Sequence, residues 1–222
     1  MRGRLIVFEG VEGAGKSTQL RRLDARLQAA GVLCSTFREP GGTVAGDQIR
    51  EVLLNPAMSL DARTEALLFM ASRAELVATA VRPTLSEGAA VLLDRFFLST
   101  YAYQIAGRGL PEADVLAANR AATGGIVPDL TLLLTLPASE GMARAKNRGP
   151  SDRMEQSGDE FHARVEQAFA NFATPAWQTT HPEAGPIVVI NATGSADEVE
   201  RRIAAVLREH LPEYGARLER VA

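Results

Sequence analysis

A chain of 222 residues, 46% hydrophobic and 23% charged, has the composition of an ordinary globular protein and can bury a core of its own. Its formal net charge of -3 argues against broad nucleic-acid binding, and its single cysteine, Cys34, excludes an internal disulfide framework. The apolar run Leu5–Phe8 is too short for a signal peptide or a membrane span. We therefore expect a cytoplasmic protein with neither a nucleic-acid nor a membrane partner, built as one domain over residues 1–222.

Short apolar runs alternate with longer helical patterns along the chain. The runs predict strands over Leu5–Glu9, Val32–Phe37, Ala90–Asp94, Leu130–Leu136 and Ile187–Ile190. The patterns between and after them predict helices over Ser17–Ala30, Val44–Leu54, Arg63–Val81, Pro111–Ala122, Asp159–Gln178 and Ala196–Arg208. Strands that are apolar throughout are typical of a parallel sheet covered on both faces, so we expect an α/β fold with a five-stranded parallel sheet flanked by helices. We expect the charged C-terminal segment Pro212–Ala222 to be loosely ordered.

The first predicted strand runs directly into a glycine-rich loop, and a helix follows. The loop reads Gly10-Val11-Glu12-Gly13-Ala14-Gly15-Lys16-Ser17, which fits the phosphate-binding pattern G-x-x-x-x-G-K-[ST]. Its glycines allow backbone N–H groups to surround a polyphosphate, and the helix N-terminus adds its positive dipole end. Lys16 would bind the β- and γ-phosphates, and the Ser17 hydroxyl would bind Mg²⁺. We therefore predict an ATP site formed by this loop together with Thr18.

A P-loop occurs in several classes of nucleotide-binding protein, and two features of this sequence exclude some of them. A GTPase would carry the guanine-reading motif N-K-x-D, but neither lysine of this chain, Lys16 or Lys146, follows an asparagine. Motor and AAA-type ATPases are longer. The small size therefore favours a kinase that acts on a small molecule.

A second carboxylate and an arginine follow the third predicted strand. Ligands of open α/β sheets bind at the carboxyl ends of the strands, which places Asp94 where it could hold a metal's water shell. Arg95 would clamp an acceptor phosphate, because its planar guanidinium makes bidentate bonds to phosphate. A surface ion pair is the alternative. The loop Arg38–Thr43 follows the second strand in the same way and would shape the acceptor pocket, or it could be only a turn.

Taken in order, these strings resemble the bacterial thymidylate kinase family over nearly the whole chain. The matching strings are Phe8-Glu9-Gly10 through Thr18, Thr36-Phe37-Arg38-Glu39-Pro40-Gly41-Gly42-Thr43, Leu68-Phe69 through Arg73, Asp94-Arg95 through Ser99-Thr100-Tyr101-Ala102-Tyr103-Gln104, Pro128-Asp129-Leu130-Thr131, and Arg148 through Glu155. The strings R-E-P-G-G-T and D-R-x-x-x-S-T-x-A-Y-Q are specific to this family. The resemblance implies a P-loop nucleoside-monophosphate-kinase fold with a lid loop, and phosphorylation of dTMP to dTDP by ATP and Mg²⁺ for dTTP synthesis. It also implies a homodimer.

The resemblance further implies roles for individual residues. Phe69 would stack on the thymine ring, Arg73 would hydrogen-bond its carbonyl, and Thr100 and Gln104 would help to read the base edge. Tyr103 would fill the space that a ribose 2′-hydroxyl needs. The complete substrate-binding set is Glu12, Arg38, Glu39, Phe69, Arg73, Arg95, Ser99, Thr100, Tyr103 and Gln104, with Glu12 on the sugar 3′-hydroxyl or near the metal. The alternative is ordinary packing: Phe69 and Arg73 lie one helical turn apart, and Tyr103 could belong to the core.

Four cations, Arg144, Lys146, Arg148 and Arg153, fall in a polar stretch that we expect to form a lid over about 144–158. Arginines folded over the transferred phosphate would lower the barrier, and a closing loop would exclude water. Because the P-loop itself contains no arginine, the chain resembles the family members with lid arginines. Arg153 is then the first candidate for the γ-phosphate, with Arg148 beside it. A solvated basic helix end is the alternative.

The sequence departs from the family at one position and leaves two other functions open. Thr135 stands where the family usually has an aspartate, so the fourth strand supplies no carboxylate. Another small-molecule P-loop kinase, for a deoxynucleoside or a different monophosphate, is one alternative function. A nucleotide-binding switch protein without transferase activity is the other, although it would not need the R-E-P-G-G-T and A-Y-Q strings.

Overall fold

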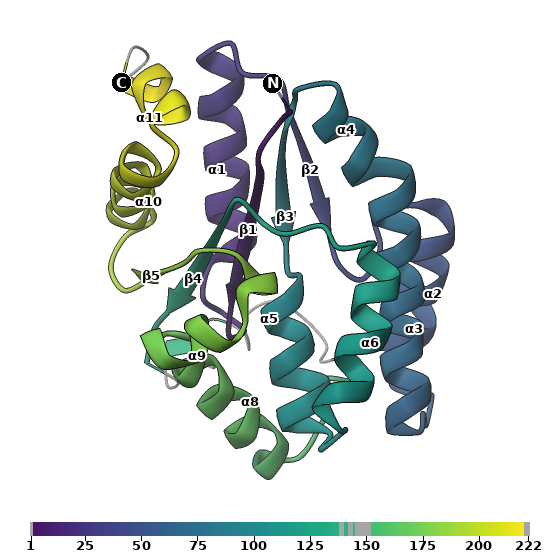
Figure 1. The fold of residues 1–222 in the computed structure, drawn as a ribbon. Coiled ribbons are helices and arrows are strands. Elements are labelled where there is room, and N and C mark those ends of the chain that lie inside the picture. Colours follow the sequence, from purple (N-terminus) through teal and green to yellow (C-terminus); the bar gives the residue numbers. More distant parts are fainter. Residues whose placement is uncertain (1, 138–139, 142–143, 145–151, 220–222) are drawn as a thin grey trace.

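The computed structural model describes residues 2–137, 140–141, 144 and 152–219, and its centre is one parallel sheet (Figure 1). Its strands are β1 (Leu5–Gly10), β2 (Cys34–Arg38), β3 (Ala90–Asp94), β4 (Leu130–Thr135) and β5 (Ile187–Asn191). They are hydrogen-bonded in the order β2-β3-β1-β4-β5, and every pairing is parallel. The predicted five-stranded parallel α/β sheet is therefore confirmed, and each strand begins and ends within two residues of its predicted bounds.

Helices cover both faces of this sheet, as Figure 1 shows. The first face packs against α1 (Lys16–Ala29), α10 (Ala196–His210) and α11 (Pro212–Leu218), with β1 contributing Ile6 and Phe8. The opposite face, where β1 contributes Leu5 and Val7, packs against the consecutive helices α3 (Ala62–Leu76), the π-helical turn Val77–Val81, and α4 (Arg82–Ser86). Alternate residues of one strand thus enter two different cores, which explains why the strand is apolar throughout.

The remaining helices pack beyond the β4 and β5 side and beside α3. They are α2 (Val44–Leu54), α5 (Phe97–Thr100), a π-helical continuation Tyr101–Gly107, α6 (Glu112–Thr123), α8 (Asp159–Phe172), α9 (Pro175–Thr180) and the short 3-10 turn Pro182–Ala184. Thr43 caps α2 by accepting from the Gly46 N–H at 2.9 Å, and Asp61 caps α3 by accepting from the Arg63 N–H at 2.9 Å. The Asp61 cap agrees with the start predicted for that helix.

Three segments of the chain differ in structure from what the sequence predicted. The helix predicted over Asp159–Gln178 is two helices, because Pro175 starts α9 and Thr174 caps it with a bond from the Trp177 N–H. The segment 97–107, for which no helix was predicted, is helical. The expectation of a loosely ordered C-terminal segment is wrong over 212–219, since α11 buries Tyr214 and Leu218 against the first core.

Within the described ranges, none of the helices combines the length and apolar character that crossing a bilayer requires.

Candidate active site

The P-loop connects the carboxyl end of β1 to the start of α1, as its sequence predicted. Gly13 has φ +76°, and a Cβ atom there would lie 2.2 Å from the carbonyl oxygen of Gly141, so this position requires glycine. Gly15 precedes α1 in the left-handed conformation, with φ 88°. The loop therefore has a tight backbone path that ends at a helix N-terminus, which is the geometry that binds phosphate.

Lys16 lies inside the loop that it belongs to. Its side chain is buried, and Nζ donates to the carbonyl oxygens of Gly10 at 2.9 Å and Val11 at 2.8 Å. Burial, helped by the nearby charge of Arg95, lowers the pKa of Lys16 to about 7. A polyphosphate bound at this nitrogen would favour the charged form, so the site is suited to an anion.

Ser17 and Asp94 meet at the end of the sheet, although 77 residues separate them in sequence. The Ser17 hydroxyl donates to Asp94 Oδ2 at 2.7 Å. No group of three or more His, Cys, Asp or Glu side chains that could hold a metal occurs among the described residues. A hydroxyl and one carboxylate are hard oxygen donors that fit Mg²⁺ when phosphate oxygens and water complete its coordination, so the pair suits a nucleotide-bound magnesium ion.

Arg95 leaves β3 in a strained conformation that directs its side chain toward the P-loop. It is the one non-glycine residue with positive φ, 73°, among the described part of the chain. Its Nη1 donates to Ser99 Oγ at 3.0 Å and to the Gly10 carbonyl oxygen at 3.5 Å. Its guanidinium lies 5.3 Å from the centre of the Tyr103 ring. Arg95 and Lys16 therefore reach the same backbone carbonyl.

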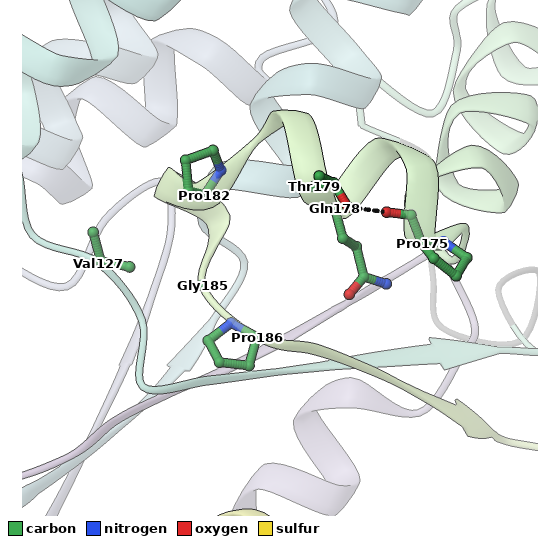
Figure 2. A pocket seen from close by; sticks show the side chains of 7 residues that line it. All are labelled: Val127, Pro175, Gln178, Thr179, Pro182, Gly185 and Pro186. Carbon is green, nitrogen blue, oxygen red and sulfur yellow. Dashed lines mark hydrogen bonds between the residues drawn. The ribbon is translucent and has the colours of Figure 1, made fainter.

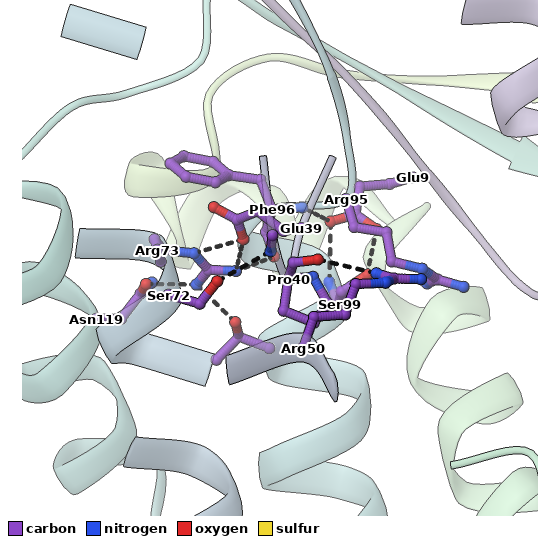
Figure 3. Close-up of polar contacts among 12 residues, drawn as sticks. Glu9, Glu39, Pro40, Arg50, Ser72, Arg73, Arg95, Phe96, Ser99 and Asn119 are labelled. Atoms are coloured by element: carbon purple, nitrogen blue, oxygen red, sulfur yellow. Dashed lines mark hydrogen bonds and ion pairs between the residues drawn. The ribbon is translucent and has the colours of Figure 1, made fainter. Parts of the chain in front are cut away.

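Two further arginines lie near Arg95, one predicted and one not. Burial, together with the charges of Arg38 and Arg95, lowers the pKa of Arg50, so the three guanidinium groups are electrostatic neighbours. Arg50 Nη1 donates to the Pro40 carbonyl oxygen at 2.9 Å (Figure 3). Arg38 is more exposed and lies 3.9 Å from Asp47. Sequence reasoning missed Arg50, because it belongs to α2 and to no recognised motif; its position one helix after R-E-P-G-G-T was the available signal.

Arg73, a residue of α3, is buried against the turn that follows β2 (Figure 3). Nε and Nη2 donate to Glu39 Oε2, Nη1 donates to Thr100 Oγ1 at 2.7 Å and to Asn119 Oδ1 at 2.6 Å, and Nη2 donates to the Phe96 carbonyl oxygen at 2.9 Å. Burial raises the pKa of Glu39, and the charge of Arg73 opposes that rise. All five N–H groups of Arg73 thus have protein partners, so contact with a thymine carbonyl would require sharing or exchanging one of them.

Among the residues that the structure describes, three buried polar atoms on the partners of Arg73, or one turn after its partner Thr100, have no hydrogen-bond partner. They are Glu39 Oε1, Gln104 Nε2 and Asn119 Nδ2. Buried polar atoms are nearly always paired, so this group indicates a place where a ligand or water supplies the missing bonds. Glu39 and Gln104 were predicted site residues, whereas Asn119, on α6, was not, because no motif pointed to it.

Phe69 and Tyr103 both lie half-buried against the core that α8 forms. Phe69 is on α3, one turn before Arg73, and the Tyr103 ring is 6.1 Å from the ring of Phe161. Both side chains therefore border the region of Arg73 and Arg95 and also pack against the core. Their expected contacts with the base and the sugar stay predictions.

The four cations of the predicted lid fall into three cases. Lys146 and Arg148 lie outside the described residues. Arg144 contacts the Ala192 carbonyl oxygen at 3.4 Å and Glu140 at 3.5 Å.

Arg153, the first candidate for the γ-phosphate, lies instead on α2 and α3. Its Nη1 is 2.8 Å from the buried Glu65 Oε2, and its Nε donates to the Leu53 carbonyl oxygen at 2.7 Å. Arg108 binds both oxygens of the same Glu65 carboxylate, at 3.0 and 2.9 Å. A role for Arg153 on the γ-phosphate stays a prediction, and it requires Arg153 to leave Glu65.

Glu155, two residues further, contacts the P-loop. Its carboxyl is hydrogen-bonded to that of Glu12, and burial together with this neighbour raises the pKa of Glu155 to about 7. Thr135, at the position where a carboxylate is usual, has its hydroxyl 3.4 Å from the Ile190 carbonyl oxygen on the neighbouring strand β5. The P-loop carboxylate Glu12 is thus coupled to a residue of the predicted lid, and Thr135 joins two strands.

A separate hollow of about 490 Å³ lies at the opposite, amino ends of β4 and β5 (Figure 2). It is lined by Val127, Pro175, Gln178, Thr179, Pro182, Gly185 and Pro186. These residues bring no charge, so they do not suit a nucleotide phosphate.

The sheet order, the phosphate loop after β1 and the Asp94–Arg95 pair after β3 define a P-loop nucleoside monophosphate kinase fold. The family model described as thymidylate kinase matches residues 8–203, and the chain belongs to this family. It is 46% identical to the thymidylate kinase of Deinococcus radiodurans, over 93% of this chain and 97% of that protein. It is 44% identical to the thymidylate kinase of Pseudomonas fluorescens, over 95% and 98%, and 40% identical to that of Trichodesmium erythraeum, over 96% and 99%.

Proposed function

We propose that this protein transfers the γ-phosphate of ATP to dTMP, giving ADP and dTDP, as a step of dTTP biosynthesis. Membership of the thymidylate kinase family supports this activity. The observation that carries it in the structure is the shared Gly10 carbonyl, which holds Lys16 and Arg95 at one point. A donor phosphate on the lysine and an acceptor phosphate on the arginine would then meet end to end.

Positioning and electrostatics supply the catalysis in this proposal. The loop N–H groups of 10–18 hold the ATP phosphates, and Lys16 neutralises charge on the β- and γ-phosphates. Arg95, with Arg38 and Arg50, holds the dTMP phosphate in line. Mg²⁺, held near Ser17 and Asp94, would neutralise further charge on the phosphates of ATP. The attacking oxygen of dTMP is already anionic, so no strong general base is required.

The residues around Arg73 are proposed to hold the base and sugar. Phe69 stacks on thymine, and Gln104, with its buried unpaired Nε2, donates to a base oxygen beside Arg73 and Thr100. Tyr103 excludes a ribose 2′-hydroxyl by filling its space. Glu12 contacts the 3′-hydroxyl, and Glu39 and Ser99 contribute by holding Arg73 and Arg95.

The lid, the assembly and the compartment belong to the same proposal. Residues of about 144–158 close over the phosphates within a single kinase domain, with Arg148 and Arg153 as the arginines that contact the transferred group. Two copies associate through the α2 and α3 surface, where Val52 and Leu67 are exposed at 36% and 62%. The protein acts in the cytoplasm.

The test is ADP release in a coupled assay with ATP and each nucleoside or nucleoside monophosphate. Turnover with dTMP that exceeds turnover with dUMP, and little turnover with ribonucleotides, is the expected result. Faster turnover with a deoxynucleoside or another monophosphate would replace dTMP as the acceptor. Tight ATP binding without transfer to any acceptor would instead indicate a nucleotide switch.

A further inference from the structure

Glu9 is a completely buried carboxylate at the end of β1, next to the first residue of the P-loop. Its Oε1 accepts from the Phe96 N–H at 2.7 Å and from the Ser99 N–H at 3.0 Å, and its Oε2 accepts from Ser99 Oγ at 2.7 Å (Figure 3). The helix α5 has no capping side chain of its own, because Phe96 stands at its N-cap. Glu9 thus caps this helix from a different strand.

The hydrogen bond between Glu9 and Ser99 also determines that Ser99 acts as an acceptor toward Arg95. An ionised carboxylate can only accept, so the single hydroxyl proton of Ser99 must lie on the bond to Glu9. Ser99 Oγ can therefore only accept from Arg95, and Arg95 Nη1 lies 3.0 Å away. The chain of bonds runs from Arg95 through Ser99 to Glu9. Arg95 also needs outside support, because its backbone is strained at φ 73°.

We propose that Glu9 is a positioning residue for the acceptor phosphate, acting through Ser99 on the guanidinium of Arg95. This inference rests on the proposed role of Arg95 in binding dTMP. Because Glu9 directly precedes Gly10, whose carbonyl oxygen accepts from both Lys16 and Arg95, one buried carboxylate links the donor loop to the acceptor arginine. A fully buried charge is costly, and here the hydrogen bonds from Phe96 and Ser99 offset the cost, while the nearby Glu9 carboxylate favours the charged forms of Lys16 and Arg95.

The change Glu9→Gln separates this role from helix capping. Glutamine has the same shape, and its oxygen still accepts from the Phe96 and Ser99 N–H groups. Its amide nitrogen, however, donates where Oε2 accepted, so the Ser99 proton loses the carboxylate as its partner and Oγ must accept from two donors. Capping is kept, while Ser99 becomes a weaker and less firmly oriented acceptor for Arg95.

The experiment measures KM for dTMP and ATP, kcat and equilibrium dTMP binding for Glu9→Gln, Ser99→Ala and the double variant. Each single variant is expected to raise KM for dTMP about tenfold or more and to leave KM for ATP within about twofold. The double variant is expected to match the worse single variant, because both break one relay. Ser99→Thr keeps the hydroxyl, so it should bind dTMP as wild type does, in contrast to Ser99→Ala. The comparison of these two Ser99 variants tests the proposal even if Glu9→Gln does not fold.

A matched control is Glu198→Gln, which changes another carboxylate that caps a helix and accepts from a serine hydroxyl. It should leave KM for dTMP unchanged. Additive effects in the double variant, or a KM for dTMP within about twofold of wild type in Ser99→Ala, would overturn the proposal. The variant Arg95→Ala tests the role of Arg95 separately from the positioning role of Glu9. Unchanged dTMP binding in this variant would remove Arg95 from the acceptor site.

Discussion

Lys16 and Arg95 donate to one acceptor, the carbonyl oxygen of Gly10, at 2.9 Å and 3.5 Å. The lysine belongs to the P-loop after β1, and the arginine belongs to the turn after β3. Two cations gathered at one backbone oxygen suit two phosphates that react with each other, and they would not suit two separate binding sites. Transfer between phosphates follows from this arrangement more directly than from the P-loop alone, which only indicates a nucleotide.

Replacing Lys16 tests the donor half of this arrangement. Lys16→Met removes the charge but keeps an unbranched apolar side chain, so we expect kcat to fall about a hundredfold or more, with dTMP binding little changed. Steady-state kinetics and a dTMP titration measure the two effects. The control Arg21→Met removes an exposed cation from the same helix and should leave kcat unaltered. If Lys16→Met kept most of its kcat, the lysine would have no part in the transfer.

Replacing Asp94 tests the magnesium site. Asp94→Asn keeps the size of the side chain but removes its charge, and the Ser17 hydroxyl then has a weaker partner at the present 2.7 Å contact. The Mg²⁺ concentration that gives half-maximal activity should rise roughly tenfold or more. A magnesium titration at saturating ATP and dTMP measures it, with the exposed Asp114→Asn as the control. An unchanged magnesium requirement would show that Asp94 does not support the metal.

Local signals in the sequence were enough to predict the sheet and the phosphate loop. Each strand is a short apolar run because both faces of the sheet are covered. The P-loop residues are contiguous in sequence, so their phosphate-binding chemistry can be recognised without knowing the fold. The segment 97–107 was different. Its string of aromatic and small residues shows no regular helical period, and Tyr101–Gly107 is π-helical.

The parts of the site that sequence reasoning missed depend on contacts between distant residues. Glu9 meets Ser99 across 90 positions, and Arg73 meets Asn119 across 46. Glu9 reads as part of a strand, and Asn119 as an ordinary helix residue, until the sheet brings their partners beside them. Arg153 is the opposite case, because its motif predicted a contact with phosphate, whereas in the structure its guanidinium forms an ion pair with Glu65.

The contact between Arg153 and Glu65 gives a prediction about stability. Arg153→Ala removes one of two arginines from a buried carboxylate, so we expect the free energy of unfolding to fall by about 2 kcal/mol, with Arg108 limiting the loss. Urea denaturation measures this change, and Arg201→Ala, which changes an exposed arginine on α10, is the control.

Kinetics at a temperature where Arg153→Ala stays folded then test its proposed role on the γ-phosphate. A fall in kcat of tenfold or more, with little change in KM, is expected if Arg153 leaves Glu65 during turnover. An unchanged kcat would remove Arg153 from the chemistry and leave it as an anchor of α2 and α3.

The carboxyl pair Glu12–Glu155 predicts a pH dependence of stability. The pKa of Glu155 is raised from its usual 4.5 to about 7, by burial first and then by Glu12, so the folded protein holds a proton that the unfolded chain releases. The stabilisation is complete below about pH 4.5 and is lost as the pH rises through 7. Glu155→Gln keeps a hydrogen bond without the charge, so its stability should not fall over this range.

Urea denaturation of both proteins at pH 5 and pH 8 measures the difference. Because Glu155 is partly exposed, solvent screening reduces the expected gain of the variant over wild type at pH 8 to about 1 kcal/mol, with a smaller difference at pH 5. Glu166→Gln, which changes an exposed carboxylate on α8, is the control and should follow the wild-type profile. If Glu155→Gln lost stability with rising pH as wild type does, the two carboxyls would not share a proton, and the part of the predicted lid around Glu155 would have to be held near the P-loop by other contacts.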